Sequence, residues 1–492
     1  MQLLGIDAGT SSVKVSVLDG ASGQALATAL YPPDEMGVSA PQAGWAEQDP
    51  ESWWENLQYA IYHVLQAPGV DAQAIGAIGV AYQMHGLVLL DEAMQVIRPA
   101  IIWSDSRAVP FGEEAFAALG AEKCLSHLLN SPGNFTAAKL AWVLEHEPKN
   151  AARIHKLMLP GDYLALQLTG EAGSSYSGLS EGVMWDFKEN APADFLLDHW
   201  EIERSWLPVV QGCFAPRGGL RREVAEALGL PEGIPVTYRA GDQPNNAFAL
   251  GAVQAGEVAA TAGTSGVVYG VSDRVAYDPQ SRVNTFAHVN HTPEQPSLGI
   301  LLCINGTGIL NRWLKRTLGD LGYDQMNELG LATPVGAEGL RVLPFGNGAE
   351  RVLGNRQLGA QFSGLDLNRH GRGHLVRAAH EGIAFAFRYG LEIMQGLGVD
   401  GRRLRAGEGN LFLSPIFREA LATAADLEIE LYATDGSQGA ARGAGVGVGH
   451  FKDFAEAHHG LEKTATVGPT PVHREAYEAA YQGWLSELQR RL

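Results

Sequence analysis

Residues 3–20 read LLGIDAGTSSVKVSVLDG, two apolar, β-branched runs on either side of the short turn AGTS at 8–11. This pattern is typical of two strands joined in a hairpin. The same four letters return at 262–265, inside VAATAGTSGVVYG at 258–270, again between two such runs. The second copy lies about half a chain after the first. We therefore expect two related domains that each contain this hairpin near their start.

The segments that follow each turn also correspond. In the first half, ATALYPP at 27–33 predicts a third strand, and 50–67 has apolar residues at helical spacing. In the second half, a third strand is predicted at 297–308 and a helix at 307–319. Strands and helices alternate in both halves, which favours two α/β domains with a boundary near 240–256.

Composition limits the class of protein. A chain of 492 residues is too long for one ordinary core. The net charge of −19 argues against binding nucleic acid, which needs clustered Lys and Arg. Three widely spaced cysteines favour neither a disulfide framework nor a zinc site. No leader pattern and no run of 18 apolar residues is seen, so we expect a cytoplasmic protein with no membrane segment.

The two AGTS turns suit a phosphate group. Glycine allows close approach of a ligand to the backbone, and successive N–H groups with Thr and Ser hydroxyls can bind an anion. One copy alone would be an ordinary hairpin turn. Asp7 directly precedes the first copy. A carboxylate beside a phosphate requires a cation such as Mg²⁺ between them, whereas the alternative is a buried capping residue.

A further acidic candidate follows a strand in RAGDQPNNAFALGAV, residues 239–253. Asp242 would stand at the carboxyl end of that strand, which is where open α/β sheets bind their ligands. An Asp in this position is also a common helix N-cap. The two roles are compatible.

Other short stretches identify nothing alone. AYQMHG at 81–86 ends a strand with a His that is as readily a packed residue as a ligand. WSDSRA at 103–108 contains Asp105 and Arg107, which would also suit a surface ion pair of little value. The glycines at 407–410 and 437–445 lack the context of a dinucleotide fingerprint, which argues against a nicotinamide enzyme.

Taken together, these stretches resemble the FGGY carbohydrate kinases over nearly the whole chain. The resemblance rests on Asp7–Ser12, Gln83–Gly86, Trp103–Arg107, Gly241–Gln243 and Gly263–Gly266, in that order and spacing. It implies an α/β fold of two actin-like (ribonuclease H-like) domains, here 1–243 and 244–492, with a catalytic cleft between them. It also implies ATP and Mg²⁺ as cofactors, a small sugar as substrate and a homodimer.

The resemblance assigns roles position by position. Asp242 matches the catalytic base, and Asp7 matches the residue that holds Mg²⁺ directly or through water. The sugar pocket is matched by Gln83, Met84, His85, Asp105 and Gln243. The ATP site is matched by Thr10, Ser11, Gly263, Thr264, Ser265, Gly409 and Asn410.

Within the family, QMHG and the run after it resemble a pentulose pocket, which implies phosphorylation of D-xylulose to D-xylulose 5-phosphate. Three stretches depart from that pattern: Asp242-Gln243 in place of Asp-Asn, GNGAERVLGN at 346–355 without Thr-Pro, and the loop GEGNLFLS. A kinase for glycerol, ribulose or another polyol or ketose remains an alternative. A non-catalytic ATP-binding sugar sensor is another, although it predicts loss of Asp7 or Asp242, and both are present.

Overall fold

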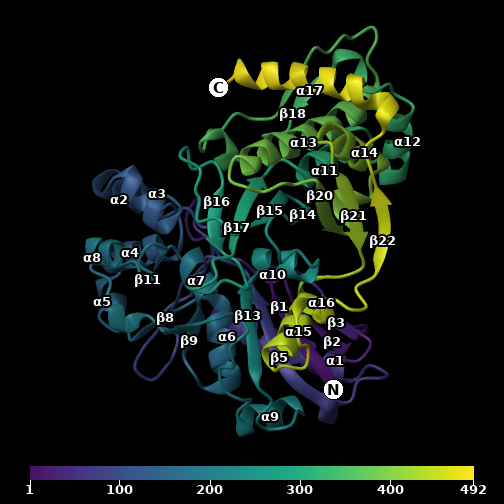
Figure 1. Cartoon of the computed structure of the whole chain (residues 1–492). Helices are drawn as coiled ribbons and strands as arrows, with labels where there is room; N and C mark the ends of the chain where they lie inside the picture. The colour runs from purple at the N-terminus through teal and green to yellow at the C-terminus, as the bar shows by residue number, and fades with distance from the viewer. The chain divides into compact units, whose positions relative to one another are not determined.

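The computed structural model describes all residues from 1 to 492, and their contacts form two compact units. The first unit comprises residues 1–253, 285–298 and 434–461. The second comprises residues 254–284, 299–433 and 462–492. Figure 1 labels the helices and strands of both.

The first unit is built on a five-stranded sheet with the order β13-β5-β1-β2-β3. The AGTS turn at 8–11 joins the antiparallel strands β1 (Gln2–Ala8) and β2 (Val13–Asp19), as the sequence predicted. Next comes β3 (Ala25–Tyr31), while β5 (Ile75–Tyr82) and β13 (Val236–Gly241) run parallel to β1. Parallel strands end at the same edge of a sheet, so β1, β5 and β13 direct their following residues to one place.

Helices cover this sheet on both faces. Apolar side chains of α1 (Pro50–Leu65) and α6 (Pro160–Thr169) pack with Leu4 and Ile6 on one face. The small-residue helix α15 (Gly436–Gly447) packs on the other face with Leu3.

Two glycines let α15 approach the sheet closely. A Cβ at Gly5 of β1 would lie 1.9 Å from the carbonyl oxygen of Ser437, and one at Gly79 of β5 would lie 2.0 Å from that of Ala440. No side chain can occupy that space, so the backbone of α15 lies directly on the strands. The small residues of α15 therefore allow its close packing on the sheet.

The second unit repeats the plan of the first. Its neighbouring strands have the order β17-β15-β14-β20-β21-β22. The second AGTS turn joins β14 (Val258–Ala262) to β15 (Gly266–Ser272) in an antiparallel hairpin, and β20 (Arg403–Gly407) lies parallel to β14. The remaining strands are β17 (Leu298–Ile304), β21 (Glu428–Tyr432) and β22 (Lys463–Val467). The same order of hairpin and parallel strands in both units confirms the predicted pair of related α/β domains.

The contacts divide the chain differently from the expected boundary between residues 243 and 244. Helix α10 (Asp242–Ala249) packs on α15 and β13, so residues 244–253 belong to the first unit. Residues 285–298 and 434–461 return to the first unit as well. Such a return depends on contacts between residues far apart in the chain, which local sequence patterns do not carry.

None of the helices combines the length and the hydrophobicity needed to span a membrane. The remaining helices and strands complete the two units. The other helices longer than one turn are α2 (Val109–Leu119), α3 (Ala121–Leu128), α4 (Thr136–His146), α7 (Tyr176–Glu181), α8 (Asp194–His199), α9 (Arg222–Leu228), α11 (Gly308–Thr317), α12 (Tyr323–Leu331), α13 (Arg372–Gln395), α14 (Pro415–Ala424) and α17 (Arg474–Gln489). One-turn helices are α5 (Pro148–Ala151) and α16 (Phe454–Ala457). The shorter strands are β4 (Glu47–Gln48), β6 (Val88–Leu90), β7 (Ala100–Ile101), β8 (Lys156–Met158), β9 (Gly173–Ser175), β10 (Trp185–Asp186), β11 (Ala191–Pro192), β12 (Val209–Gln211), β16 (Asn284–Ala287), β18 (Arg341–Leu343) and β19 (Gln361–Ser363).

Candidate active site

The candidate site of the first unit lies where its three parallel strands end. Tyr82 at the end of β5 pairs with Ala8 of β1 on one side and with Gly241 of β13 on the other. The residues that follow, beginning at Gly9, Gln83 and Asp242, therefore meet at one edge of the sheet. The Gln83 N–H donates to the Ala8 carbonyl at 2.9 Å, which continues the pairing past the strands.

Thr10 of the first AGTS turn is tied to the sugar-side residues of the sequence prediction. Its hydroxyl donates to Gln83 Oε1 at 3.0 Å and accepts from Trp103 Nε1 at 2.9 Å. Gln83 Nε2 donates in turn to Gln48 Oε1 at 2.9 Å. The side chain of Trp103 is 53% exposed although one edge is held by this bond. An exposed, immobilised indole is a surface on which the C–H face of a sugar can pack, and the sequence prediction did not include Trp103.

Met84 lies against the end of β13, the strand that leads into Asp242, and His85 is the next residue. A Cβ on Gly241 would lie 2.5 Å from Met84 Cγ, so glycine is required for this approach. The His85 ring packs edge-on to Phe135, with ring centres 4.9 Å apart. The predicted sugar-pocket residue Met84 therefore lies against the residue that precedes Asp242, and His85 follows Met84 in the chain.

Asp242 is the first residue of α10, and Gly241 occupies the N-cap position. Asp242 is therefore not the N-cap residue, although the N–H groups of Asp242 and Gln243 hydrogen-bond to its carboxylate. Burial, with a smaller contribution from the charge of Asp7, raises the Asp242 pKa to about 7. Gln243 Nε2 donates to Asp242 Oδ2 at 3.1 Å and opposes that rise. A carboxylate with a pKa near neutrality is suited to accept a proton from a hydroxyl group.

Asp7 stands near the end of β1, where α15 begins. A Cβ at Gly436 would lie 2.3 Å from Asp7 Oδ2, so the carboxylate contacts the N-terminus of that helix. Burial and then the neighbouring Asp435 raise the Asp7 pKa to about 6, while Lys14 lowers it. Lys14 Nζ lies 3.4 Å from Asp435 Oδ2.

The donor set around Asp7 fits one type of cation binding. No group of three or more His, Cys, Asp or Glu residues could enclose a metal ion by itself. Mg²⁺ is commonly held by one or two carboxylates together with the phosphates of a nucleotide, and that mode needs no such group. Mutual repulsion among Asp7, Asp435 and Asp242 is what a bound cation would relieve.

Asp105 has a different environment from the one that the sequence suggested. It is fully buried, and its carboxylate accepts from the Arg107 guanidinium at 2.7 Å and from the Ala46 N–H at 2.6 Å. Arg107 also pairs with Glu47 at 2.8 Å. The pair is therefore a buried structural network rather than a surface ion pair. Both carboxylate oxygens of Asp105 are therefore engaged in hydrogen bonds within the protein.

The second AGTS turn is supported by the helix that follows the third strand of the second unit. The N–H groups of Gly308 and Ile309 at the start of α11 donate to the carbonyls of Gly263 and Thr264, at 2.9 and 3.1 Å. A Cβ on Gly308 would lie 2.2 Å from the Gly263 oxygen. Glycine at 308 is thus needed for the turn to rest on the helix.

A cavity of about 650 Å³ opens beside this turn. It is lined by Gly263, Thr264 and Asn410 of the sequence prediction, while Ser265 and Gly409 are their chain neighbours and are not among its lining residues. The prediction missed further polar lining residues from four later segments: Asn311, Arg312, Tyr323, Asp324, Asn327, His380 and Ser414. The other two residues of the predicted ATP site, Thr10 and Ser11, belong to the first unit and do not line this cavity.

Glu350 supports the loop between β17 and α11. The N–H of Asn305 donates to both carboxylate oxygens at 3.1 Å, and burial raises the Glu350 pKa to about 7. This residue lies in GNGAERVLGN, the stretch that departs from the family pattern.

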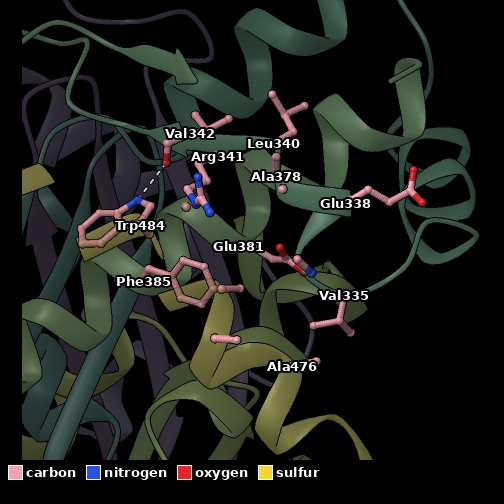
Figure 2. A pocket seen from close by; sticks show the side chains of 15 residues that line it. Val335, Glu338, Leu340, Arg341, Val342, Ala378, Glu381, Phe385, Ala476 and Trp484 are labelled. Atoms are coloured by element: carbon pink, nitrogen blue, oxygen red, sulfur yellow. Dashed lines mark hydrogen bonds between the residues drawn. The ribbon is translucent and has the colours of Figure 1, made fainter. Parts of the chain in front are cut away.

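Figure 2 shows a second cavity of the second unit, of about 330 Å³. Trp484 and Arg341 line it, and Trp484 Nε1 donates to the Val342 carbonyl at 2.9 Å. Glu381 on its wall is already paired with Arg377 at 2.7 Å. This cavity contains none of the predicted site residues and shares no lining residue with the larger one.

Comparisons with known proteins match both halves of the chain. The model of the N-terminal domain of the FGGY family of carbohydrate kinases matches residues 2–249, and the C-terminal domain model matches residues 258–446. The xylulose kinase of Escherichia coli (strain K12) is 32% identical over 442 residues, which is 90% of this chain and 88% of that protein.

Solved structures show the same fold. The xylulose kinase from Rhodospirillum rubrum superposes with a TM-score of 0.89 at 27% identity, covering 100% of this chain and 99% of that chain. The Plasmodium falciparum glycerol kinase with ADP, at 19% identity over 100% of this chain and 98% of that one, has a TM-score of 0.87 and shares the fold.

The chain belongs to the FGGY family of carbohydrate kinases. It is a carbohydrate kinase with the two-domain fold of that family, and kinases of this family use ATP. Xylulose kinases are among the members to which it is similar over most of its length.

Proposed function

We propose that this kinase transfers the γ-phosphoryl group of ATP to the C5 hydroxyl of D-xylulose. The observation that carries the proposal is that Met84, which directly precedes His85, packs on Gly241, the residue before Asp242, at one sheet edge. The named activity of the xylulose kinases to which the chain is similar supports the choice of sugar. Gln83, Gln243 and the exposed face of Trp103 complete the proposed sugar pocket.

The proposed reaction needs one base and well-placed charge. Asp242 accepts the proton of the C5 hydroxyl while the oxygen of that hydroxyl forms a bond to the γ-phosphorus. The bond from that phosphorus to the bridging oxygen breaks, and ADP leaves with the electron pair. Positioning and neutralisation of charge provide most of the rate in such transfers.

The nucleotide is proposed to bind in the 650 Å³ cavity of the second unit. The Gly263–Ser265 turn would hold phosphate, and Gly409 and Asn410 would lie against the adenosine. Asp7 would hold Mg²⁺, directly or through water, with Thr10 and Ser11 near the transferred phosphate. When bound, the ion neutralises phosphate charge; Asp7, Thr10 and Ser11 supply the protein side of that arrangement.

A substrate panel tests the proposal. ADP release would be measured with D-xylulose, D-ribulose, other pentuloses, glycerol and hexoses, and kcat/KM is expected to be highest for D-xylulose. The highest value for glycerol or another sugar would overturn the choice of substrate. Absence of sugar-dependent ADP release throughout would favour the sensor alternative.

The pH dependence of the reaction tests the proposed base. Asp242 must be ionised to accept a proton, and its pKa is raised to about 7. We therefore expect kcat/KM for the sugar to be constant at high pH and to fall by about tenfold per pH unit below pH 7. Initial rates between pH 5 and pH 9 would measure this, and a profile that is flat from pH 5 to pH 8 would contradict it.

A further inference from the structure

The backbone at His85 has an unusual conformation. Its φ of 62° lies in the left-handed region, which residues with a Cβ seldom adopt. Such a conformation persists only where surrounding groups impose it. The residue is also the one whose ring the proposed sugar pocket needs in a fixed place.

Two buried charged side chains hold the two polar ends of this residue. Lys139 Nζ donates to the His85 carbonyl at 2.7 Å, and the His85 N–H donates to Glu181 Oε1 at 3.4 Å. His85 Nδ1 lies 2.9 Å from the main-chain carbonyl of Glu181. A carbonyl can only accept, so Nδ1 carries the proton and the tautomer is fixed.

The segments that carry Lys139 and Glu181 also orient the imidazole ring of His85. Lys139 is on α4, and Phe135, the residue before α4, packs edge-on against the imidazole. Glu181 is the last residue of α7. Phe286 contacts the ring from a third segment, with ring centres 5.4 Å apart. Glu181 therefore contacts both the backbone and the ring of His85, while Lys139 holds the backbone and Phe135 packs on the ring.

Lys139 and Glu181 are costly residues to bury. Both side chains have 0% exposure. Burial lowers the Lys139 pKa to about 7, partly offset by Asp105, and burial together with Asp242 raises the Glu181 pKa well above its ordinary value. Ionisable groups are rarely buried unless a specific partner requires them, and the His85 peptide is the partner that both share.

We propose that Lys139 and Glu181 are positioning residues that fix His85 in its left-handed conformation and thereby set the affinity of the sugar pocket. They act through His85 and do not touch the sugar. This inference rests on the proposed function, in which His85 binds the sugar.

The Lys139→Met variant tests the first half of the inference. Methionine fills a similar volume without a donor, so KM for the sugar is expected to rise about 10–100-fold, the range for loss of a charged hydrogen bond. KM for ATP is expected to stay unchanged because the nucleotide cavity is in the second unit. Lys149→Met, at an exposed residue of α5, is the matched control.

A double variant separates positioning from a general loss of structure. If Lys139 acts through His85, adding Lys139→Met to His85→Ala should raise KM for the sugar no further. Effects of the two substitutions that simply multiply would overturn the inference. A crystal structure of Lys139→Met that keeps the left-handed backbone at His85 and an unaltered ring would overturn it as well.

Glu181 gives an independent measurement. Glu181→Gln keeps an oxygen that can accept from the His85 N–H, so its rise in sugar KM should be much smaller than that of Glu181→Met. Equal effects would contradict a positioning role, and Glu189→Gln at an exposed residue is the control. All measurements use the best sugar of the panel, so a different sugar would correct the proposed function and leave this inference open to the same test.

Discussion

Replacing Asp242 with asparagine is expected to lower kcat by about 10²–10⁴-fold, the usual contribution of a general base. The amide has nearly the same shape but cannot take up a proton from the C5 hydroxyl. Gln243 Nε2, which donates to Asp242 Oδ2, can still find an oxygen on the asparagine. The local structure should therefore be kept while the chemistry is lost. Steady-state rates of ADP release with the best sugar would measure the change.

Two further measurements show whether the loss is chemical. Sugar binding by calorimetry should be largely kept in Asp242→Asn, and Asp198→Asn, at an exposed residue of α8, should have ordinary turnover. Thermal stability at pH 8 should not fall. The pKa of Asp242 is raised in the folded protein, so its charge destabilises the fold above pH 7, and removing that charge relieves repulsion with Asp7. A variant that keeps most of its turnover would show that Asp242 is not the base.

The hairpins were the part of the fold that local sequence carried best. Apolar runs on both sides of a Gly-containing turn leave few alternatives, and both AGTS hairpins form at the predicted residues. The return of residues 434–461 to the first unit was not predictable in this way. It depends on glycines of β1 and β5 that allow α15 to pack closely on these strands. The sequence around either glycine contains no signal that indicates this contact.

The candidate site shows the same division. Asp242 was singled out because it follows a strand of an α/β sheet, whereas Gln83 was assigned only through the family resemblance. The orientation of a side chain could not be predicted in this way. Asp105 was expected in the sugar pocket, and its carboxylate accepts a hydrogen bond from Arg107. The buried Lys139 had a visible signal, since it interrupts the apolar run of AAKLAWV. A lone lysine in an apolar helix face indicates a buried partner, but sequence does not say which one.

Replacing Asp7 with asparagine is expected to lower kcat/KM for MgATP by about 10²–10³-fold, the cost of losing one preorganised electrostatic group. The side chain keeps its volume against Gly436 and loses the charge proposed to hold Mg²⁺. Rates would be measured as a function of MgATP at saturating sugar. Sugar affinity by calorimetry should change little, and Asp34→Asn, at an exposed residue, is the matched control.

The pH profile gives Asp7→Asn a second signature. The negative charge of Asp7 contributes to the raised pKa of Asp242, so its removal should lower that pKa. The fall of kcat/KM for the sugar at acid pH is then expected to begin below pH 7. At the same time kcat/KM for MgATP is expected to decrease. Substitution of a residue that only supported the fold would not shift the pH dependence of kcat/KM for the sugar. It would also not selectively lower kcat/KM for MgATP. Equal decreases in kcat/KM for the sugar and for MgATP, with no shift of the pH dependence, would contradict the metal role of Asp7 and its electrostatic coupling to Asp242.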